Sequence, residues 1–527
     1  MSDKRRMVKA AGIVGSATML SRVLGYVRDA VIAWFFGAGM AADAFLAALP
    51  VSNLLRRLLG EGALTSSFVP VFTDYIEKNS KEEARVFVSR FTTFFFVVLV
   101  VVTALCIWFS EPLVRLITPG FADNPEKFGL TVRLTQIMFP YMVFVGLMAV
   151  AMGVLNALRH FFAPAISPVL LNISMIGSVL IVAPFVESPA HALAASVLVG
   201  GLLQLLVQLP YLKKFGMLPG IAFAFRDPGV WKVLKLLIYS AIGLGIYQLN
   251  VVIILRFASG LSEGSVSYLY YATRLMELPL GVFGVSLATA ALPALSMHAS
   301  RNDAAAFSGA LSNAVKLSNF ICLPATAGLM ALAYPITDIL FVRGEFSPYD
   351  AKQTAVALLF FAVGIVPVAI SRVLVSVFYS LKDTKTPVIL SFFAFIFNIA
   401  MCVALVGPLK HGGLAFAASL SAFFNTVLLA LVLYKRLGAF FNVADWRDFG
   451  VSMLASVVMG VAVYRFTAMF DWHALSFFGK TALLSGAIAL GIGIYAAMSA
   501  LFKVREFDFV CGLLKEKAKA LQGKIRL

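Results

Sequence analysis

Charged side chains interrupt three stretches of this chain that are otherwise apolar. The stretches read "SRVLGYVRDA" from Ser21, "NLLRRLLGEG" from Asn53 and "YYATRLMELP" from Tyr270. Their charged residues are Arg22, Arg28, Asp29, Arg56, Arg57, Glu61, Arg274 and Glu277. Because the arginine guanidinium is a planar fork of donors, it suits bidentate binding of phosphate oxygens. The stretches therefore predict a site for an anionic ligand inside an apolar environment.

In each stretch the polar residues fall on one face of the expected helix, by the i, i+3/i+4, i+7 rule. The aligned sets are Ser21, Gly25 and Arg28, with Arg22 and Asp29 beside them; Asn53, Arg57 and Glu61; and Ser267, Tyr270, Arg274 and Glu277. A charge at mid-bilayer costs roughly 2.5–3.5 kcal/mol, so exposing four arginines to lipid would cost on the order of 10 kcal/mol. These faces must therefore meet a wet cavity or charged partners.

Two interpretations of the charges stay open for any single pair. Arg57 with Glu61 and Arg274 with Glu277 could be intramembrane ion pairs that only hold helices together. As a set, however, the five arginines outnumber the four carboxylates, which are Asp29, Asp43, Glu61 and Glu277. This surplus of positive charge favours a cationic cavity and an anionic substrate.

The composition places these stretches in a membrane. Of the 527 residues, 61% are hydrophobic and 13% are charged, and the mean hydropathy is +0.92. Because only a helix satisfies its own backbone groups in lipid, the sequence predicts an all-α polytopic membrane protein. We expect about fourteen spans, near residues 10–36, 41–72, 91–118, 129–156, 163–185, 191–211, 230–257, 266–297, 308–333, 353–380, 387–406, 413–434, 448–470 and 479–502.

The net charge of +17 indicates orientation in the membrane rather than nucleic-acid binding. With both termini on one side, that side collects the N-terminal Lys4, Arg5 and Arg6, the loop residues Lys213 and Lys214, and the tail "KEKAKALQGK". The opposite loops keep few basic residues. Because basic loops stay in the cytoplasm, we expect a multi-pass protein with both termini cytoplasmic.

An internal repeat divides the chain. The segments "NALRHFFAP" and "YSLKDTKTP" align without a gap, so that Arg159 matches Lys382 and Pro164 matches Pro387. The offset of about 220 residues corresponds to six spans, and an even number of spans gives both copies the same orientation. We therefore expect two six-helix lobes, residues 1–225 and 226–440, two additional helices over 441–503, and a basic cytoplasmic tail over 504–527.

Several kinds of chemistry have no support in the sequence. The four cysteines lie far apart and the five histidines occur singly, so we expect neither a disulfide framework nor a metal site. No G-x-x-x-x-G-K-[ST] motif marks a nucleotide site. We expect no catalytic residue and no cofactor, which means that the protein is not an enzyme.

The same residues carry a resemblance to a known family. The segments "SRVLGYVRDA", "FGAGMAADAF", "NLLRRLLGEGALTSSFVPVF" and "YYATRLMELPLGVFGVSLATAALP" are similar to the MurJ (MviN) family of bacterial lipid II flippases, over about residues 10 to 435. That family belongs to the multidrug/oligosaccharidyl-lipid/polysaccharide exporter superfamily, with two six-helix lobes and alternating access. The resemblance implies movement of the undecaprenyl-diphosphate-linked peptidoglycan precursor from the inner to the outer leaflet of the cell (inner) membrane.

The resemblance also implies roles for individual residues. The diphosphate would be engaged by Arg22, Arg28 and Arg274, with Arg56 and Arg57 beside it and Ser21, Asn53 and Ser267 as polar neighbours. Gating or charge-balancing pairs would involve Asp29, Asp43, Glu61 and Glu277. Thr273 stands where family members often carry a carboxylate, so a gate there must use another group, such as Glu277.

Partners and energetics are less constrained. Lipid II and membrane lipids are the implied partners, any cell-wall synthesis proteins are unidentified, and no nucleic acid is expected. A coupling ion is not specified, although Asn398 could take part in ion coupling, and the membrane potential is expected to assist export. The alternatives are a flippase for another polyprenyl-diphosphate-linked glycan, a multidrug exporter and a membrane glycosyltransferase. The arginine surplus argues against the second, and the short outward loop at 334–352 argues against the third.

The last expected span carries a stripe of small residues, Gly486, Ala489, Gly493, Ala496 and Ala500, on one helical face. Such a face packs closely against another helix. Alternatively, as the resemblance implies, it borders a groove for the lipid tail.

Overall fold

The computed structural model describes residues 3–55, 64–224, 226–301, 303–438, 442–472 and 474–512. Every regular element in these ranges is a helix, so the all-α prediction is confirmed. The chain divides into two compact units. Unit 1 comprises Met1–Ser267 and Arg343–Ser347, and unit 2 comprises Tyr268–Val342 and Pro348–Leu527.

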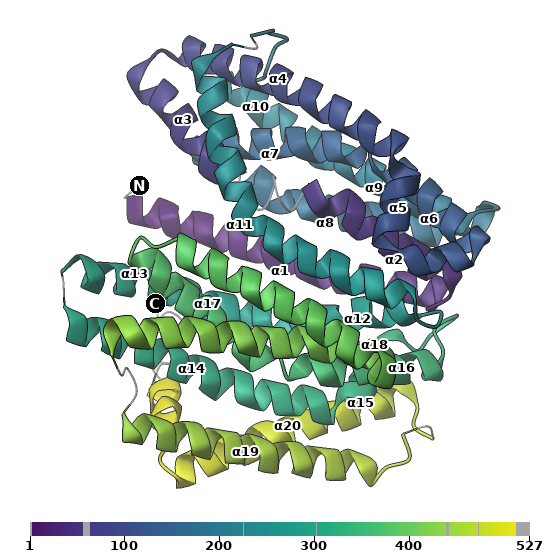
Figure 1. The fold of residues 1–527 in the computed structure, drawn as a ribbon, viewed down its shortest axis with the longest axis vertical. Helices are drawn as coiled ribbons and strands as arrows, with labels where there is room; N and C mark the ends of the chain where they lie inside the picture. Colours follow the sequence, from purple (N-terminus) through teal and green to yellow (C-terminus); the bar gives the residue numbers. More distant parts are fainter. Residues whose placement is uncertain are drawn as a thin grey trace, which may run out of the picture. The chain divides into compact units, whose positions relative to one another are not determined.

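Unit 1 is built from long helices joined by short turns, coloured purple to teal in Figure 1. In chain order they are α1 (Asp3–Phe36), α2 (Met40–Leu55), α3 (Leu64–Lys78), α4 (Lys81–Trp108), α5 (Ser110–Ile117), η2 (Pro119–Asp123), α6 (Pro125–Met138), α7 (Tyr141–Ala157), α8 (Phe162–Gly177), η3 (Ser178–Val182), η4 (Ala183–Phe185), α9 (Pro189–Leu206), α10 (Leu209–Phe215) and α11 (Pro228–Ser259). Helix α1 packs against α8, α2 against α6, and both α3 and α4 against α7.

Unit 2 begins inside the next helix, at Tyr268, and includes the rest of the chain apart from Arg343–Ser347. Its helices are α12 (Ser265–Pro279), η5 (Leu280–Gly284), α13 (Val285–Ser300), α14 (Ala304–Ala331), α15 (Ala333–Phe341), α16 (Pro348–Ala362), α17 (Ile365–Ser380), α18 (Lys385–Leu437), α19 (Val443–Ala468) and α20 (Phe477–Leu501). Helix α14 packs against α19, and α19 packs against α20, as Figure 1 also shows.

Polar residues begin several of these helices, as their sequences lead one to expect. Asn124 and Asp227 each precede a proline at the first helical position, and each side chain accepts backbone N–H groups of the first turn. Asn442 and Asp445 form a reciprocal capping box at the start of α19. These caps satisfy N–H groups that have no partner within the helix.

Eight helices in the described ranges are long and apolar enough to cross a membrane, and a pair bent by 42°, α16 with α17, brings the number to nine. One of the eight, α18, is two helices merged across a break at Lys410, where φ is +49°. This break lies between the two expected spans 387–406 and 413–434. Helix α1 is not among the eight, and it contains Arg22, Arg28 and Asp29. The total of about fourteen spans stays a prediction.

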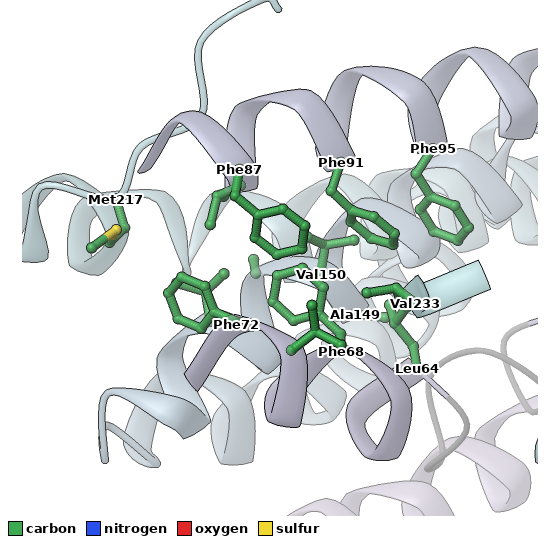
Figure 2. Packing of buried hydrophobic residues seen from close by; sticks show 14 of the residues in the cluster. Leu64, Phe68, Phe72, Phe87, Phe91, Phe95, Ala149, Val150, Met217 and Val233 are labelled. Carbon is green, nitrogen blue, oxygen red and sulfur yellow. The ribbon is translucent and has the colours of Figure 1, made fainter. Parts of the chain in front are cut away.

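Stacked phenylalanines form a buried cluster in unit 1, between α3, α4 and α7 (Figure 2). The ring of Phe68 lies 5.5 Å from that of Phe72, 5.7 Å from that of Phe87 and 5.0 Å from that of Phe91. A Cβ on Gly153 of α7 would lie 3.0 Å from Phe68. The small residue therefore lets α3 approach α7, which is how membrane helices gain packing without a hydrophobic driving force between them.

The two copies of the predicted repeat fold alike locally. Arg159 and Lys382 both have positive φ, +58° and +60°. In each copy the following N–H donates to the carbonyl five residues earlier, His160 to Leu155 at 2.8 Å and Asp383 to Phe378 at 2.9 Å. This is the Schellman ending of a helix, with a basic residue where glycine is usual. A positive charge there also suits the negative end of the helix dipole.

Asp383 joins the two ends of the α18 segment. Its carboxylate accepts hydrogen bonds from the Thr386 hydroxyl at 2.6 Å and the Thr386 N–H at 3.0 Å, and from Arg436 Nη1 at 2.7 Å. The Thr386 hydroxyl and N–H, followed by the Arg436 guanidinium, hold the pKa of Asp383 well below its usual range. A carboxyl with a depressed pKa stabilises the folded state above its ordinary pKa and loses that effect as the pH falls through the depressed value.

Replacing Asp383 with asparagine is therefore expected to lower the Tm at pH ~7, with a difference from the native protein that shrinks as the pH falls below about 4. Thermal unfolding of the detergent-solubilised protein at several pH values measures this. Asp303→Asn is the matched control, because Asp303 only caps α14, accepting from Ala306 N at 3.0 Å, and asparagine caps equally well. A pH-independent difference for Asp383→Asn would contradict the account.

The two glycines in the small-residue stripe of α20 do not pack against another helix in the described part of the chain. Gly486 and Gly493 are exposed, and a Cβ on either would meet open space. The buried face of α20 is instead Ala487, Gly491, Tyr495 and Ser499. A Cβ on Gly491 would lie 3.1 Å from Val463 of α19. Within the residues that the structure describes, Gly486 and Gly493 therefore make no close helix contact.

Candidate functional site

The first cluster of predicted site residues lies in unit 1, where α1 meets α8. Arg28 donates to Asp29 Oδ1 from Nη2 at 2.7 Å and from Nε at 2.9 Å, and Nη1 donates to Asn172 Oδ1 at 3.0 Å. Asn172 in turn donates from Nδ2 to the carbonyl of Ser21 at 3.0 Å. The structure thus brings together Ser21, Arg28 and Asp29 through Asn172.

Burial makes this cluster a low-dielectric charge site. Arg28 is 8% exposed and Asp29 is 2% exposed. A buried guanidinium that already has a carboxylate partner is pre-oriented, and a second anion that needs the same donors must displace that partner. Arg22, six residues earlier on α1, is exposed.

The second cluster is centred on the carboxylate of Asp43, near the start of α2. It accepts from Lys127 Nζ at 2.7 Å, Gly264 N at 2.9 Å, Ser267 N at 3.0 Å and Ser267 Oγ at 2.7 Å. Asp43 is 1% exposed and Lys127 is 8% exposed. Lys127 Nζ also lies 4.3 Å from the ring centre of Phe121. One carboxylate therefore fixes α2, α6 and the start of α12 together.

The third cluster lies in unit 2, on α12. Arg274 Nη1 pairs with Glu277 Oε2 at 3.0 Å, and Arg274 Nη2 donates to the hydroxyl of Tyr270 at 3.2 Å. The side chains of Arg274 and Glu277 are 29% and 38% exposed, so this pair is more accessible than Arg28 with Asp29. The hydroxyl of Thr273 donates to the Leu269 carbonyl at 2.8 Å and carries no charge.

Just beyond this pair the helix widens into the π-helical turn η5, Leu280–Gly284. Such a turn leaves backbone carbonyls without their regular partners and is frequent at functional sites. The carbonyl of Leu280 accepts from Arg372 Nη1 of α17 at 3.3 Å. A further arginine is thus held close to the segment that carries Arg274.

The structure places the remaining predicted residues as follows. Asn53 is half-buried in α2. Arg56, Arg57 and Glu61 lie outside the described residues. No group of three or more histidine, cysteine or carboxylate side chains suited to a metal occurs in the ranges that the structure describes.

Sequence reasoning missed three polar residues that complete these clusters. Neither Lys127 nor Asn172 was among the predicted site residues. Arg372 was overlooked, although it interrupts the apolar run "VPVAISRVLVSVF" in the same way as the other arginines. The rule that a charge inside an apolar span needs a partner or a function would have found it.

Long apolar helices that carry arginine–carboxylate pairs define a multi-pass membrane protein. A solved structure titled "Lipid II flippase MurJ, inward closed conformation" matches with a TM-score of 0.79 and 26% identity, over 93% of this chain and 98% of that one. A multidrug resistance MATE family transporter of the MOP superfamily, inward-facing, matches with a TM-score of 0.67 over 82% of this chain and 98% of its own. At 15% identity, that second likeness shows the fold alone.

Sequence comparison gives the family. The sequence model of the family described as "Lipid II flippase MurJ" matches residues 32–483. A protein of Vibrio cholerae named "Probable lipid II flippase MurJ" is 36% identical over 513 residues, 96% of this chain and 98% of that protein. "Lipid II flippase MurJ" of Burkholderia cenocepacia is 34% identical over 499 residues, 93% of this chain and 96% of its own. The chain belongs to the MurJ family.

Proposed function

We propose that this chain is a lipid II flippase, a transporter and not an enzyme. It moves the undecaprenyl-diphosphate-linked peptidoglycan precursor from the inner to the outer leaflet of the bacterial inner membrane by alternating access. The observation that carries the proposal is the family match over residues 32–483, together with full-length relatives named for this activity. The substrate chemistry agrees with the arginines, because a guanidinium fork binds phosphate oxygens in a bidentate manner.

In this proposal the arginines exchange partners during transport. Arg28 and Arg274 each hold a carboxylate, Asp29 and Glu277, in the present conformation. A diphosphate that reaches either arginine competes with that carboxylate for the same donors. When no substrate is bound, the carboxylates take the place of the diphosphate and neutralise the arginines. This avoids the cost of an isolated buried charge.

A flippase for another polyprenyl-diphosphate-linked glycan would use the same arginines, and the names of the relatives favour lipid II. A multidrug exporter shares the fold, but a surplus of arginine is unsuited to cationic drugs. The functional test is depletion of the protein in its source bacterium while the leaflet location of labelled lipid II is followed. Labelled lipid II should accumulate in the inner leaflet, and unchanged flipping would refute the assignment.

Both termini are proposed to be cytoplasmic, since the basic loops gather on their side. With that orientation, export moves about two negative charges outward through the inside-negative field, which favours transport by roughly 4–5 kcal/mol per 100 mV. Collapse of the membrane potential at constant pH is expected to slow flipping in reconstituted vesicles. An unchanged rate would count against electrogenic export and would favour coupling to an ion, for which Asn398 is a candidate.

The exposed stripe of α20 is proposed to border a groove for the lipid tail. Gly493→Leu should leave the Tm unchanged, because its side chain meets open space, while it slows flipping. Gly491→Leu is the matched control: it overpacks the contact with α19 and should destabilise the protein by ~1–3 kcal/mol. Thermal unfolding and a flipping assay separate the two. Full flipping activity of Gly493→Leu would show that the stripe does not border the groove for the lipid tail.

A further inference from the structure

One short turn belongs to unit 1 although it lies in the middle of the sequence of unit 2. Its residues are Arg343–Ser347, and the chain before and after them belongs to unit 2. Within the turn, Phe346 N donates to the Arg343 carbonyl at 3.2 Å, and Phe346 is 1% exposed. None of the transport roles above uses this turn, which we call the strap.

The strap lies against the end of α1 and is joined to it through the backbone. Glu345 N donates to the Trp34 carbonyl at 2.9 Å. Trp34 lies in the last turn of α1, where carbonyl groups have no partner within their own helix. The strap therefore supplies the donor for an acceptor at the end of the helix.

Two glycines allow the strap and α1 to approach this closely. Gly37, just after α1, has φ of +60°, and a Cβ there would lie 2.6 Å from the Glu345 carbonyl oxygen. Gly344 of the strap has φ of +57°, and a Cβ there would lie 2.3 Å from the Trp34 carbonyl oxygen. Both neighbours are backbone atoms, which cannot rotate away as a flexible side chain can. The contact therefore requires glycine on both of its sides.

The strap has almost no slack where it joins the helices of unit 2. Helix α15 ends at Phe341 and α16 begins at Pro348, so Val342 alone separates the strap from α15 and no residue separates it from α16. The two helices are joined to each other, because Thr337 Oγ1 of α15 donates to the Ala351 carbonyl of α16 at 3.0 Å. One residue spans at most ~3.6 Å. The strap therefore cannot stay attached to α1 if α15 and α16 move further than that from it.

We propose that the strap is a latch, which holds the end of α1 in the present conformation and detaches from it in each transport cycle. The inference rests on the alternating access of the proposed function, in which the two units move relative to each other. Covalent bonds join the strap to α15 and α16, so its non-covalent contacts with Trp34 and Gly37 are the ones that break. The latch contains none of the arginines assigned to the diphosphate.

A reversible crosslink tests the detachment. In the double variant Trp34→Cys with Glu345→Cys, a short bis-methanethiosulfonate reagent joins two residues whose backbones are already hydrogen-bonded. In vesicles with labelled lipid II, flipping by the crosslinked protein should fall to the protein-free level, and a reductant should restore the rate measured before crosslinking. The same reagent should not change the rate of either single variant or of the native protein. Flipping by the crosslinked protein at its earlier rate would overturn the latch, whereas a native protein that does not flip lipid II would contradict the proposed function.

Amide hydrogen exchange is a second measurement that needs no crosslink. The peptide that contains the strap should exchange about tenfold faster with saturating lipid II than without it. Gly344→Ala should speed the same exchange without substrate, because its Cβ meets the Trp34 carbonyl. Gly438→Ala is the matched control, since Gly438 also has a positive φ, +76°, but a Cβ there would meet nothing within 4 Å in the described residues. Exchange of the strap that stays the same with lipid II, or in a folded Gly344→Ala protein, would overturn the proposal.

Discussion

Replacing Arg28 with alanine is expected to abolish transport and to destabilise the protein at the same time. The change removes the ion pair of Asp29, which is 2% exposed, and the hydrogen bond to Asn172. Breaking a buried ion pair from one side costs roughly 3–5 kcal/mol. Growth complementation, membrane protein level and Tm measure the two effects separately.

A double variant separates the structural part from the transport part. Arg28→Ala with Asp29→Asn leaves no buried charge, so the Tm should recover while transport stays lost. Arg274→Ala tests the more accessible of the two pairs. Because the pair of Arg274 with Glu277 is more exposed to solvent than that of Arg28 with Asp29, transport should be lost with little change in Tm. Transport at the native rate by the double variant would show that Arg28 does not bind the diphosphate.

Replacing Asp43 with alanine is expected to give the largest loss of stability in unit 1. Four hydrogen bonds from Lys127, Gly264 and Ser267 end on this carboxylate. Removing it leaves the buried ammonium of Lys127 without its carboxylate partner. The expected cost is ~3–5 kcal/mol. Thermal unfolding followed by fluorescence in detergent measures it.

Two further variants test the reason for that loss. Lys127→Met in the Asp43→Ala background removes the unbalanced cation and should recover part of the Tm, because methionine packs beside Phe121. Asp123→Ala removes an exposed carboxylate from η2 and should change little. An Asp43→Ala protein with the native Tm would mean that the cluster does not hold these helices together.

Much of the fold follows from local sequence. Long apolar runs can be satisfied in lipid only as helices, and residues such as Asn124 and Asp227 begin them with side-chain caps. The matched endings at Arg159 and Lys382 were visible as an internal repeat, because the same turn requires the same short sequence. Local rules suffice wherever the partner is within one helical turn.

The site needed information that local rules do not contain. Helical spacing put Arg28 on the face of Ser21, but the partner of that face is Asn172, 144 residues away from Arg28. The carboxylate of Asp43 and its partner Lys127 are 84 residues apart. The small residues of α20 show the same limit. Glycines lie on two faces of that helix, and contact with α19 decides that Gly491 is packed and Gly493 is exposed.

The most direct test of the central claim is flipping by the purified protein in vesicles. Lipid II labelled with a fluorophore on its head group is incorporated with the protein, and a membrane-impermeant reductant reports the fraction that reaches the outer leaflet. The account predicts transfer well above that of protein-free vesicles, and transfer at the protein-free level for a folded Arg274→Ala variant. Transfer at the protein-free level by the native protein, or at the native rate by Arg274→Ala, would contradict it.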